Sequence, residues 1–301
     1  MLVGSSAWNT AARRKSVPSI ILSSLSYSCK DANSRVIPRS LRGEQEVATR
    51  TASLFGMLLI LAALAGSPVK AAPAPVAQVL QLYSYELRDK VQFEQGYQRH
   101  LAWHATHDDK LVWFGWMVDS GRRKGLFVDG TAGASYAALD TRPDLTGDAA
   151  DAVRNFLPFA QARNVETWEL WPGPSTATPL EDHKPRALVD VYVMHATPGS
   201  ALHFERLLSK LAEKRRSRSA SLTWYKAARG GALPAYMPVL SRSDWADVEH
   251  AGGTLSALLA RVYGVGPAEV GRLLEALTDV EVECWSYQPR LSLIPGTLLE
   301  P

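Results

Sequence analysis

The sequence predicts an α+β fold in which two tandem βαββαβ units pack together as a barrel. Its clearest sign is an echo, because Val165–Pro172 (VETWELWP) returns as Val282–Pro289 (VECWSYQP) with Val, Glu, Trp and the closing Pro at the same spacing. A second sign is that strand-like and helix-like stretches follow the same order ahead of each copy. Because an unrepeated fold gives no reason for such an echo, two related units explain it best.

Length and composition point to a globular protein. The chain has 301 residues, of which 46% are hydrophobic, and this is ample for a buried core. Its formal net charge is +3, but the excess of Lys and Arg lies in residues 1–72, so the remainder is mildly acidic. Binding to nucleic acid needs a concentrated basic surface, and we therefore expect no nucleic-acid partner.

An apolar run near the N-terminus predicts export. Leu54–Ala65 follows Arg50 and precedes small residues and prolines, which is the order of regions in a signal peptide. The run is too short to span a membrane, which takes roughly 20 apolar residues. We assign residues 47–72 to the signal and 1–46 to a disordered or misassigned N-terminal extension. The mature protein is expected to be periplasmic or secreted, with no stable membrane anchor.

The first unit, residues 78–172, opens with a strand and a helix. Val79–Leu87 alternates along its length and is rich in residues that favour strands. Asp89 is placed to cap the following helix, which we expect to end near Ala105. One stripe of that helix has the spacing of an inward face: Phe93, Tyr97, His100, Leu101 and His104.

The rest of the first unit predicts two strands, a helix and a closing strand. The second strand carries aromatic residues on both sides, so we expect both of its faces to be covered. Pro158 should break or kink the helix near its end, because proline lacks the backbone N–H that a helix needs. The expected ranges are Leu111–Val118 and Gly125–Gly130 for the strands, Ala149–Ala162 for the helix and Val165–Trp171 for the closing strand.

A proline-rich connection, residues 173–187, leads to the second unit, residues 188–290. Strand-like stretches at Leu188–Met194 and Ala235–Leu240 take the places of the first and third strands. The second unit is longer than the first, because Thr254–Tyr263 and Pro267–Leu277 predict two helical segments. Residues 291–301 form a C-terminal tail.

Each unit is expected to fold into a four-stranded antiparallel sheet with its helices on one face. The other face is apolar and needs a cover, which the sheet of the second unit provides most simply. The aromatic residues of the strands support this arrangement because they cannot all point at helices: Trp113, Phe114, Trp116 and Trp168.

This repeat order and aromatic placement resemble the dimeric α/β-barrel (ferredoxin-like) superfamily, which includes NIPSNAP-like proteins, in a fused two-repeat form. The resemblance covers about residues 78–290 and implies an intramolecular barrel of tandem ferredoxin-like repeats. Members of the superfamily include cofactor-free monooxygenases, lactone isomerases, haem-degrading enzymes and haem-binding peroxidases or dismutases. Their ligands commonly lie between helices and sheet. No catalytic residue of these families can be carried over to this sequence.

Two histidines interrupt the apolar stripe of the first helix. His100 and His104 stand where the second unit has Leu211 and Arg215. A polar pair facing a core needs partners or a ligand, so we assign both histidines as candidate catalytic residues. The alternative is that His100 is a satisfied core group and His104 reaches water. Aromatic residues near this stripe or on the strands are the candidate ligand-binding residues: Tyr83, Tyr97, Trp113 and Trp116.

Metal and cofactor binding have weaker support. His100, His104 and His107 have a spacing that a metal site can use, and Asp108 and Asp109 follow them. However, His107 is expected to lie beyond the helix, and the chain has neither an HExxH motif nor paired cysteines. We therefore predict no metal and no cofactor, with haem held by His100 or His104 as the alternative.

The echoed stretch also repeats a carboxylate beside an aromatic residue. Glu166 and Glu283 lie on the same strand face as Trp168 and Trp285. A carboxylate against an aromatic surface can have a raised pKa that suits acid–base chemistry. The plainer interpretation, which we prefer, is that each Glu sits at the rim of the sheet and is solvated.

These observations predict an exported α/β-barrel protein that binds a small apolar or aromatic molecule. If it is an enzyme, cofactor-independent monooxygenase or isomerase chemistry with a histidine base is expected. The alternative is a non-catalytic protein-interaction module that uses the helical insertion of the second unit, Thr254–Leu277. Substrate, catalysis and homo-oligomerisation are left open by the sequence.

Overall fold

The computed structural model describes residues 76–214, 220–247 and 253–297. These residues belong to one compact unit, Ala74–Pro301. The signal peptide and the N-terminal extension lie outside the described residues, so both stay predictions. Among the described helices, none combines the length and apolar character that crossing a membrane requires.

Eight antiparallel strands close into a barrel in the order β1-β3-β2-β8-β5-β7-β6-β4. Strands β1 to β4 are neighbours, as are β5 to β8, and the two groups are hydrogen-bonded at two seams, β2–β8 and β4–β6. Closure removes the unpaired edges that two separate sheets would expose. The predicted α+β class with a barrel is thus confirmed. The strands are Val79–Leu87, Phe114–Ser120, Leu126–Ala134, Ala160–Leu170, Leu188–Ala196, Leu222–Arg229, Ala235–Arg242 and Leu277–Tyr287 (β1 to β8).

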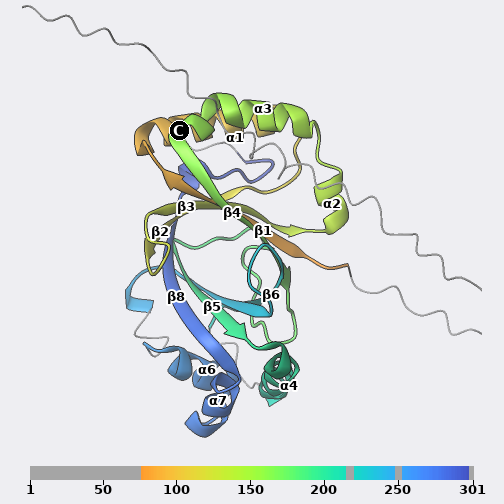
Figure 1. Ribbon diagram of the computed structural model, residues 1–301, viewed down its shortest axis with the longest axis vertical. Helices are drawn as coiled ribbons and strands as arrows, with labels where there is room; N and C mark the ends of the chain where they lie inside the picture. Colours follow the sequence, from red (N-terminus) through yellow and green to blue (C-terminus); the bar gives the residue numbers. More distant parts are fainter. Residues whose placement is uncertain (1–75, 215–219, 248–252, 298–301) are drawn as a thin grey trace, which may run out of the picture. The chain divides into compact units, whose positions relative to one another are not determined.

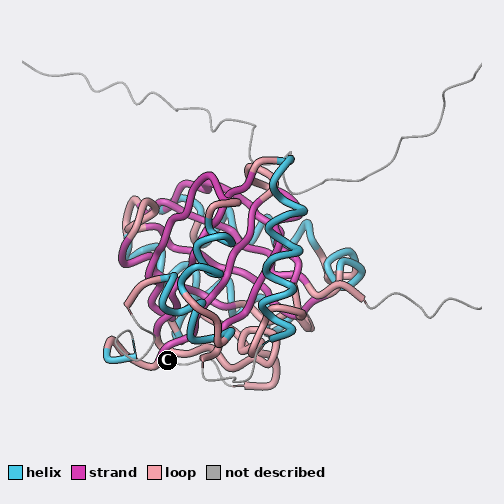
Figure 2. The backbone as a smooth tube through the Cα atoms, turned by 90° about the horizontal axis from the view of Figure 1, so that it is seen from below, coloured by secondary structure: helices cyan, strands magenta, loops and turns pink. Residues whose placement is uncertain are grey.

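The helices cover two opposite sides of the barrel (Figure 1). Helices α1 and α3 lie over the side formed by the first four strands, whereas α4, α6 and α7 lie over the other side. Figure 2 looks at the barrel from that second side and shows helices lying across the strands. The helices are α1 (Lys90–Thr106), α2 (Tyr136–Asp140), α3 (Leu145–Asn155), α4 (Pro198–Lys214), α6 (Leu255–Tyr263) and α7 (Pro267–Leu274).

Helix α3 differs from its predicted range, Ala149–Ala162, at both ends. It begins earlier because the side chain of Asp144 accepts a hydrogen bond from the backbone N–H of Gly147, at 2.9 Å. It ends at Asn155, and Pro158 lies in a separate 3₁₀ turn where its missing N–H is not needed. The last residues of the predicted helix belong to β4, which starts at Ala160.

Three apolar clusters hold the unit together, one inside the barrel and one under each helical layer. Trp168 and Trp285, the tryptophans of the echoed stretch, are both buried inside the barrel. Trp113 and Trp116 belong to different clusters, because the first lies under α1 and the second faces the barrel interior. The expectation that this stretch is covered on both sides is confirmed.

The proline-rich connection closes one end of the barrel. It sends Leu180, which is 3% exposed, into the interior beside Val189 and Val191 of β5. Val193 and His195, further along the same strand, line a pocket instead. A strand rises about 3.3 Å per residue, so the pocket lies toward the other end of the barrel, which we call the barrel mouth.

Helix α1 approaches α3 so closely that one position accepts only glycine. A Cβ atom on Gly96 would lie 2.1 Å from the backbone oxygen of Asn155. We expect Gly96→Ala to destabilise the protein by about 1–3 kcal/mol, because the two helices must separate to admit the methyl group. Gly271→Ala in α7 is the matched control, since a Cβ there meets nothing within 4 Å, and it should be neutral or stabilising. Urea denaturation measures both, and equal effects would refute the close contact.

Candidate functional site

Helix α1 places His100 and His104 one turn apart on its buried face, beneath α3. Their side chains are 8% and 3% exposed, and their ring centres are 4.6 Å apart. The predicted inward stripe is therefore confirmed, and both histidines belong to it. Their Nε2 atoms approach to 3.2 Å, so the two rings share one small volume between the helices.

Three carboxylates surround this histidine pair. His100 Nδ1 lies 2.8 Å from an oxygen of Asp151, and His104 Nδ1 lies 2.8 Å from an oxygen of Asp109. Asp148 approaches from the other side of the rings, with its Oδ1 at 3.3 Å from His100 Nε2 and 3.5 Å from His104 Nε2. Each ring is thus held between a carboxylate at Nδ1 and a carboxylate shared at Nε2.

Burial shifts the pKa of one member of this group, and hydrogen bonds shift that of another. The pKa of His100 is lowered, first by burial and then by the neighbouring His104, although nearby carboxylates oppose the shift. Burial alone would raise the pKa of Asp109, but its contacts with His104, the Leu111 N–H and the Trp113 indole lower it. His100 is therefore neutral and Asp109 ionised near neutral pH.

Among the described residues, Arg142 is the cation that pairs with these carboxylates. Arg142 Nη2 lies 2.5 Å from Asp148, and its guanidinium stands 4.9 Å from the centre of the Trp113 ring. Its side chain is 9% exposed, so this ion pair is well shielded from water. Among the described residues the arginine holds Asp148 and approaches Asp109 only at 3.9 Å.

The structure brings most of the predicted ligand-binding residues to this place. Trp113 stacks on His104 at 5.0 Å, and Tyr97 lies 6.2 Å from His100 between their ring centres. The rings of Tyr83 and Trp113 pack together with their centres 6.3 Å apart. Trp116 does not join them, because it faces the barrel interior against Trp285. The neighbourhood is a packed polar and aromatic cluster.

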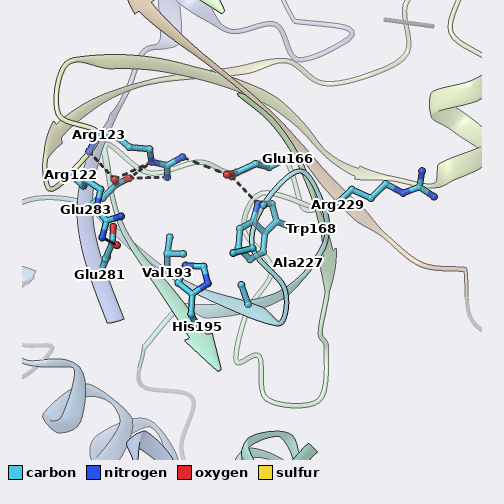
Figure 3. A pocket seen from close by; sticks show the side chains of 13 residues that line it. Arg122, Arg123, Glu166, Trp168, Val193, His195, Ala227, Arg229, Glu281 and Glu283 are labelled. Atoms are coloured by element: carbon cyan, nitrogen blue, oxygen red, sulfur yellow. Dashed lines mark hydrogen bonds and ion pairs between the residues drawn. The ribbon is translucent and has the colours of Figure 1, made fainter. Parts of the chain in front are cut away.

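A pocket of about 170 Å³ opens instead at the barrel mouth (Figure 3). Strands β4, β5, β6, β7 and β8 and the β2–β3 turn supply its walls. Trp168, Val193 and Ala227 form an apolar part, while His195 extends toward the same space. Arg229 also belongs to the lining, but its side chain points away in the view of Figure 3.

Glu166 and Glu283, the glutamates of the two echoed stretches, both line the pocket at the barrel mouth. Trp285 Nε1 donates to Glu283 at 2.9 Å, and Trp168 Nε1 donates to Glu166 at 3.2 Å. Residues two apart share a strand face, which is why Glu-x-Trp forms the same contact twice. Arg123 links the two Glu–Trp pairs. Its guanidinium donates to both carboxylate oxygens of Glu283 at 2.9–3.1 Å, and its Nη1 lies 3.9 Å from Glu166 Oε2.

The preference for a solvated rim was wrong for one of these glutamates. The side chain of Glu283 is 2% exposed, because Arg123 and Trp285 cover it. Glu166 is 18% exposed and takes a further hydrogen bond from Asn164 Nδ2 at 3.0 Å. The acid–base role considered for Glu283 loses support, because the guanidinium of Arg123 and the indole of Trp285 already donate hydrogen bonds to its carboxylate.

The sequence analysis did not identify several residues of the histidine cluster and of the barrel mouth. Asp148 and Asp151 lie on one face of α3 with Asn155, at a spacing of three and four residues, and this polar face beside Ala152 was a signal of a buried partner. The predicted helix began one residue after Asp148, which hid the pattern. Arg123 lies in a turn, where no periodicity pointed to its role.

No protein-family model matches the chain, and no curated protein matches it either. Among solved structures it is similar to a proposed monooxygenase from Fusobacterium nucleatum, with 9% identity and a TM-score of 0.48 over 70% of this chain and 93% of that one. A proposed monooxygenase from Lactobacillus acidophilus is similar with 8% identity and a TM-score of 0.45, over 70% of this chain and 94% of that one. A mutant chlorite dismutase from Candidatus Nitrospira defluvii, in complex with cyanide, is similar with 7% identity and a TM-score of 0.45, over 70% of this chain and 91% of that one.

Proposed function

We propose that the protein binds a small molecule with a flat apolar body and a polar end in the barrel mouth. The observation that carries the proposal is the pocket of about 170 Å³ between the apolar surface of Trp168 and the charged row of Glu166, Arg123 and Glu283. Ligand sites typically combine such an apolar wall with a few fixed polar groups. A cavity of roughly 150 Å³ holds a benzene ring, so the pocket suits one or two fused rings.

The polar row is rigid, which favours orientation of a ligand. Glu283 is fixed by Arg123 and Trp285, and Glu166 by Trp168 and Asn164. Side chains held in this way lose little further freedom when a ligand arrives, and preorganisation of that kind increases affinity. A small ring with a hydrogen-bonding group at one edge is therefore the ligand that this geometry suits.

The fold itself supports two finer proposals. The orders β4-β1-β3-β2 and β8-β5-β7-β6 are those of two βαββαβ units, and they support a barrel of two fused ferredoxin-like repeats. That the repeats are of NIPSNAP-like type stays a prediction. Export by the apolar segment Leu54–Ala65 is supported by the order of its flanking residues. Periplasmic or secreted localisation rests on that segment alone.

Other roles have less support. Catalysis by His100 or His104, as a base for oxygenase or isomerase chemistry or as a haem ligand, stays a prediction, because both Nε2 atoms face each other and Asp148. A protein-interaction role of the helical insertion also stays a prediction. The described apolar side chains of α6 and α7 turn largely into their own core, including Leu258 and Leu273.

Calorimetric titration with indole, phenol and benzoate tests the proposed pocket. Wild-type protein should bind at least one of these compounds, whereas Ala227→Leu, which fills the pocket wall, should weaken that binding at least about tenfold. Ala268→Leu on the exposed side of α7 is the matched control and should bind as wild type does. Equal affinity in both variants, or no binding of any compound, would count against the barrel mouth.

A further inference from the structure

We propose that His100, His104 and Asp148 form a binding site for one divalent transition-metal ion in tetrahedral geometry, of the kind that zinc prefers. The site lies between α1 and α3, outside the barrel, and is separate from the pocket at the barrel mouth. It departs from the sequence-based prediction of no metal, which considered His107 as the third ligand and had no view of Asp148.

The distances between the three ligand atoms fit one ion. His100 Nε2, His104 Nε2 and Asp148 Oδ1 are separated by 3.2, 3.3 and 3.5 Å. A tetrahedral zinc ion with bonds of about 2.0–2.1 Å holds its ligand atoms about 3.3–3.4 Å apart. An ion placed among the three atoms would therefore reach all of them without a rearrangement of the helices.

The outer contacts orient the two rings as a metal site requires. His100 Nδ1 lies 2.8 Å from Asp151 and His104 Nδ1 lies 2.8 Å from Asp109. Both Nε2 atoms therefore face each other and an oxygen of Asp148, which is the side on which an ion would bind. Carboxylates behind metal-binding histidines orient the rings in the same way.

The charged groups around the site also favour a cation. Among the described residues, the carboxylates of Asp109, Asp148 and Asp151 lie beside the two rings, and the guanidinium of Arg142 is the cation that pairs with them. Tyr97 and Asp129 pack nearby but bring no positive charge. A divalent ion between the rings would be attracted by these carboxylates.

Three protein ligands leave the fourth position of a tetrahedral ion for water or for an atom of a bound molecule. Asp148 is the most exposed of the three ligands, at 14%, so the site meets solvent on its side. The ligands come from both α1 and α3, so the ion would also fasten the two helices together. Binding to the folded state alone raises thermal stability, which gives a measurement independent of any activity.

Equilibrium dialysis of chelator-treated protein against Zn²⁺ and Co²⁺ tests the proposal. We expect one ion per chain, a rise in Tm on loading, and visible Co²⁺ absorption of the intensity that tetrahedral coordination gives. His104→Gln should abolish tight binding, and Asp151→Asn should weaken it about 10–100-fold through the orientation of His100. His107→Gln is the matched control, because His107 is the exposed C-cap residue of the same helix and lies outside the group.

Far-ultraviolet circular dichroism of each metal-free variant separates loss of a ligand from loss of the fold. Asp151→Asn keeps the shape of the side chain, so it tests the site even if His104→Gln folds poorly. Binding that is lost equally in His107→Gln would overturn the proposal, as would uptake of less than one ion per chain or a six-coordinate Co²⁺ spectrum.

Discussion

Replacing Arg123 with Met is expected to lower the free energy of unfolding by about 3–5 kcal/mol. The substitution leaves the Glu283 carboxylate, which is 2% exposed, without the guanidinium that donates to both of its oxygens. The indole of Trp285 would remain as a donor but carries no charge. A buried carboxylate deprived of its counter-ion is among the most destabilising single changes, and urea denaturation at neutral pH measures it.

Arg122 provides the matched control for this prediction. It is the neighbouring residue, but its side chain is 72% exposed and pairs with Glu281 at the surface. Arg122→Met should change stability by less than about 1 kcal/mol, because exposed ion pairs contribute little. Adding Glu283→Gln to Arg123→Met should restore part of the lost stability, since it removes the unpaired charge. Equal losses for Arg122→Met and Arg123→Met would contradict the buried pair.

The second large effect concerns Asp129, which lies on β3 beneath α1. Burial raises its pKa to about 7 from an ordinary value of 3.8, although the hydroxyl of Tyr97, which donates to it at 2.6 Å, opposes the shift. A folded-state pKa above the unfolded value means that the folded state holds the proton more tightly. The stability that this proton contributes is full below pH 3.8 and is lost as the pH rises through about 7.

Asp129→Asn removes this dependence on pH. The free energy of unfolding of the variant minus that of wild type should increase by about 3–4 kcal/mol from pH 4 to pH 8. The reason is that only wild type has to bury an ionised carboxylate at position 129 when the pH is high. The amide oxygen still accepts from Tyr97, so any constant packing effect is the same at both values. Urea denaturation in the presence of a chelator measures the difference, and a difference that does not change with pH would contradict the raised pKa.

Much of the fold was predictable because its signals are local and periodic. The inward stripe of α1 emerges from the spacing of Phe93, Tyr97 and Leu101, and all three side chains are buried. The echo of Glu-x-Trp also had a physical basis, since both tryptophans anchor the barrel interior. The α+β class with a barrel followed from the need to cover the apolar faces of the strands, whereas the strand order came only from the structure.

The sites were predictable only in part, because their members meet across long stretches of chain. His100 and His104 were identified by their place on an otherwise apolar stripe. Their partners Asp148 and Asp151 come from another helix, whose start depends on a cap at Asp144 that the sequence pattern did not reveal. The barrel mouth depends on Arg123, a turn residue that reaches Glu283 160 positions away.

Fluorine NMR of 5-fluorotryptophan-labelled protein tests the barrel mouth as a ligand site most directly. The resonance of Trp168, assigned by its loss in Trp168→Phe, should shift when the best-binding compound of the titration is added. The resonance of Trp224, which is buried on β6 beneath helices α4, α6 and α7, should stay unchanged. An unshifted Trp168 at saturating ligand, or an equal shift of both tryptophans, would contradict a ligand seated in the pocket.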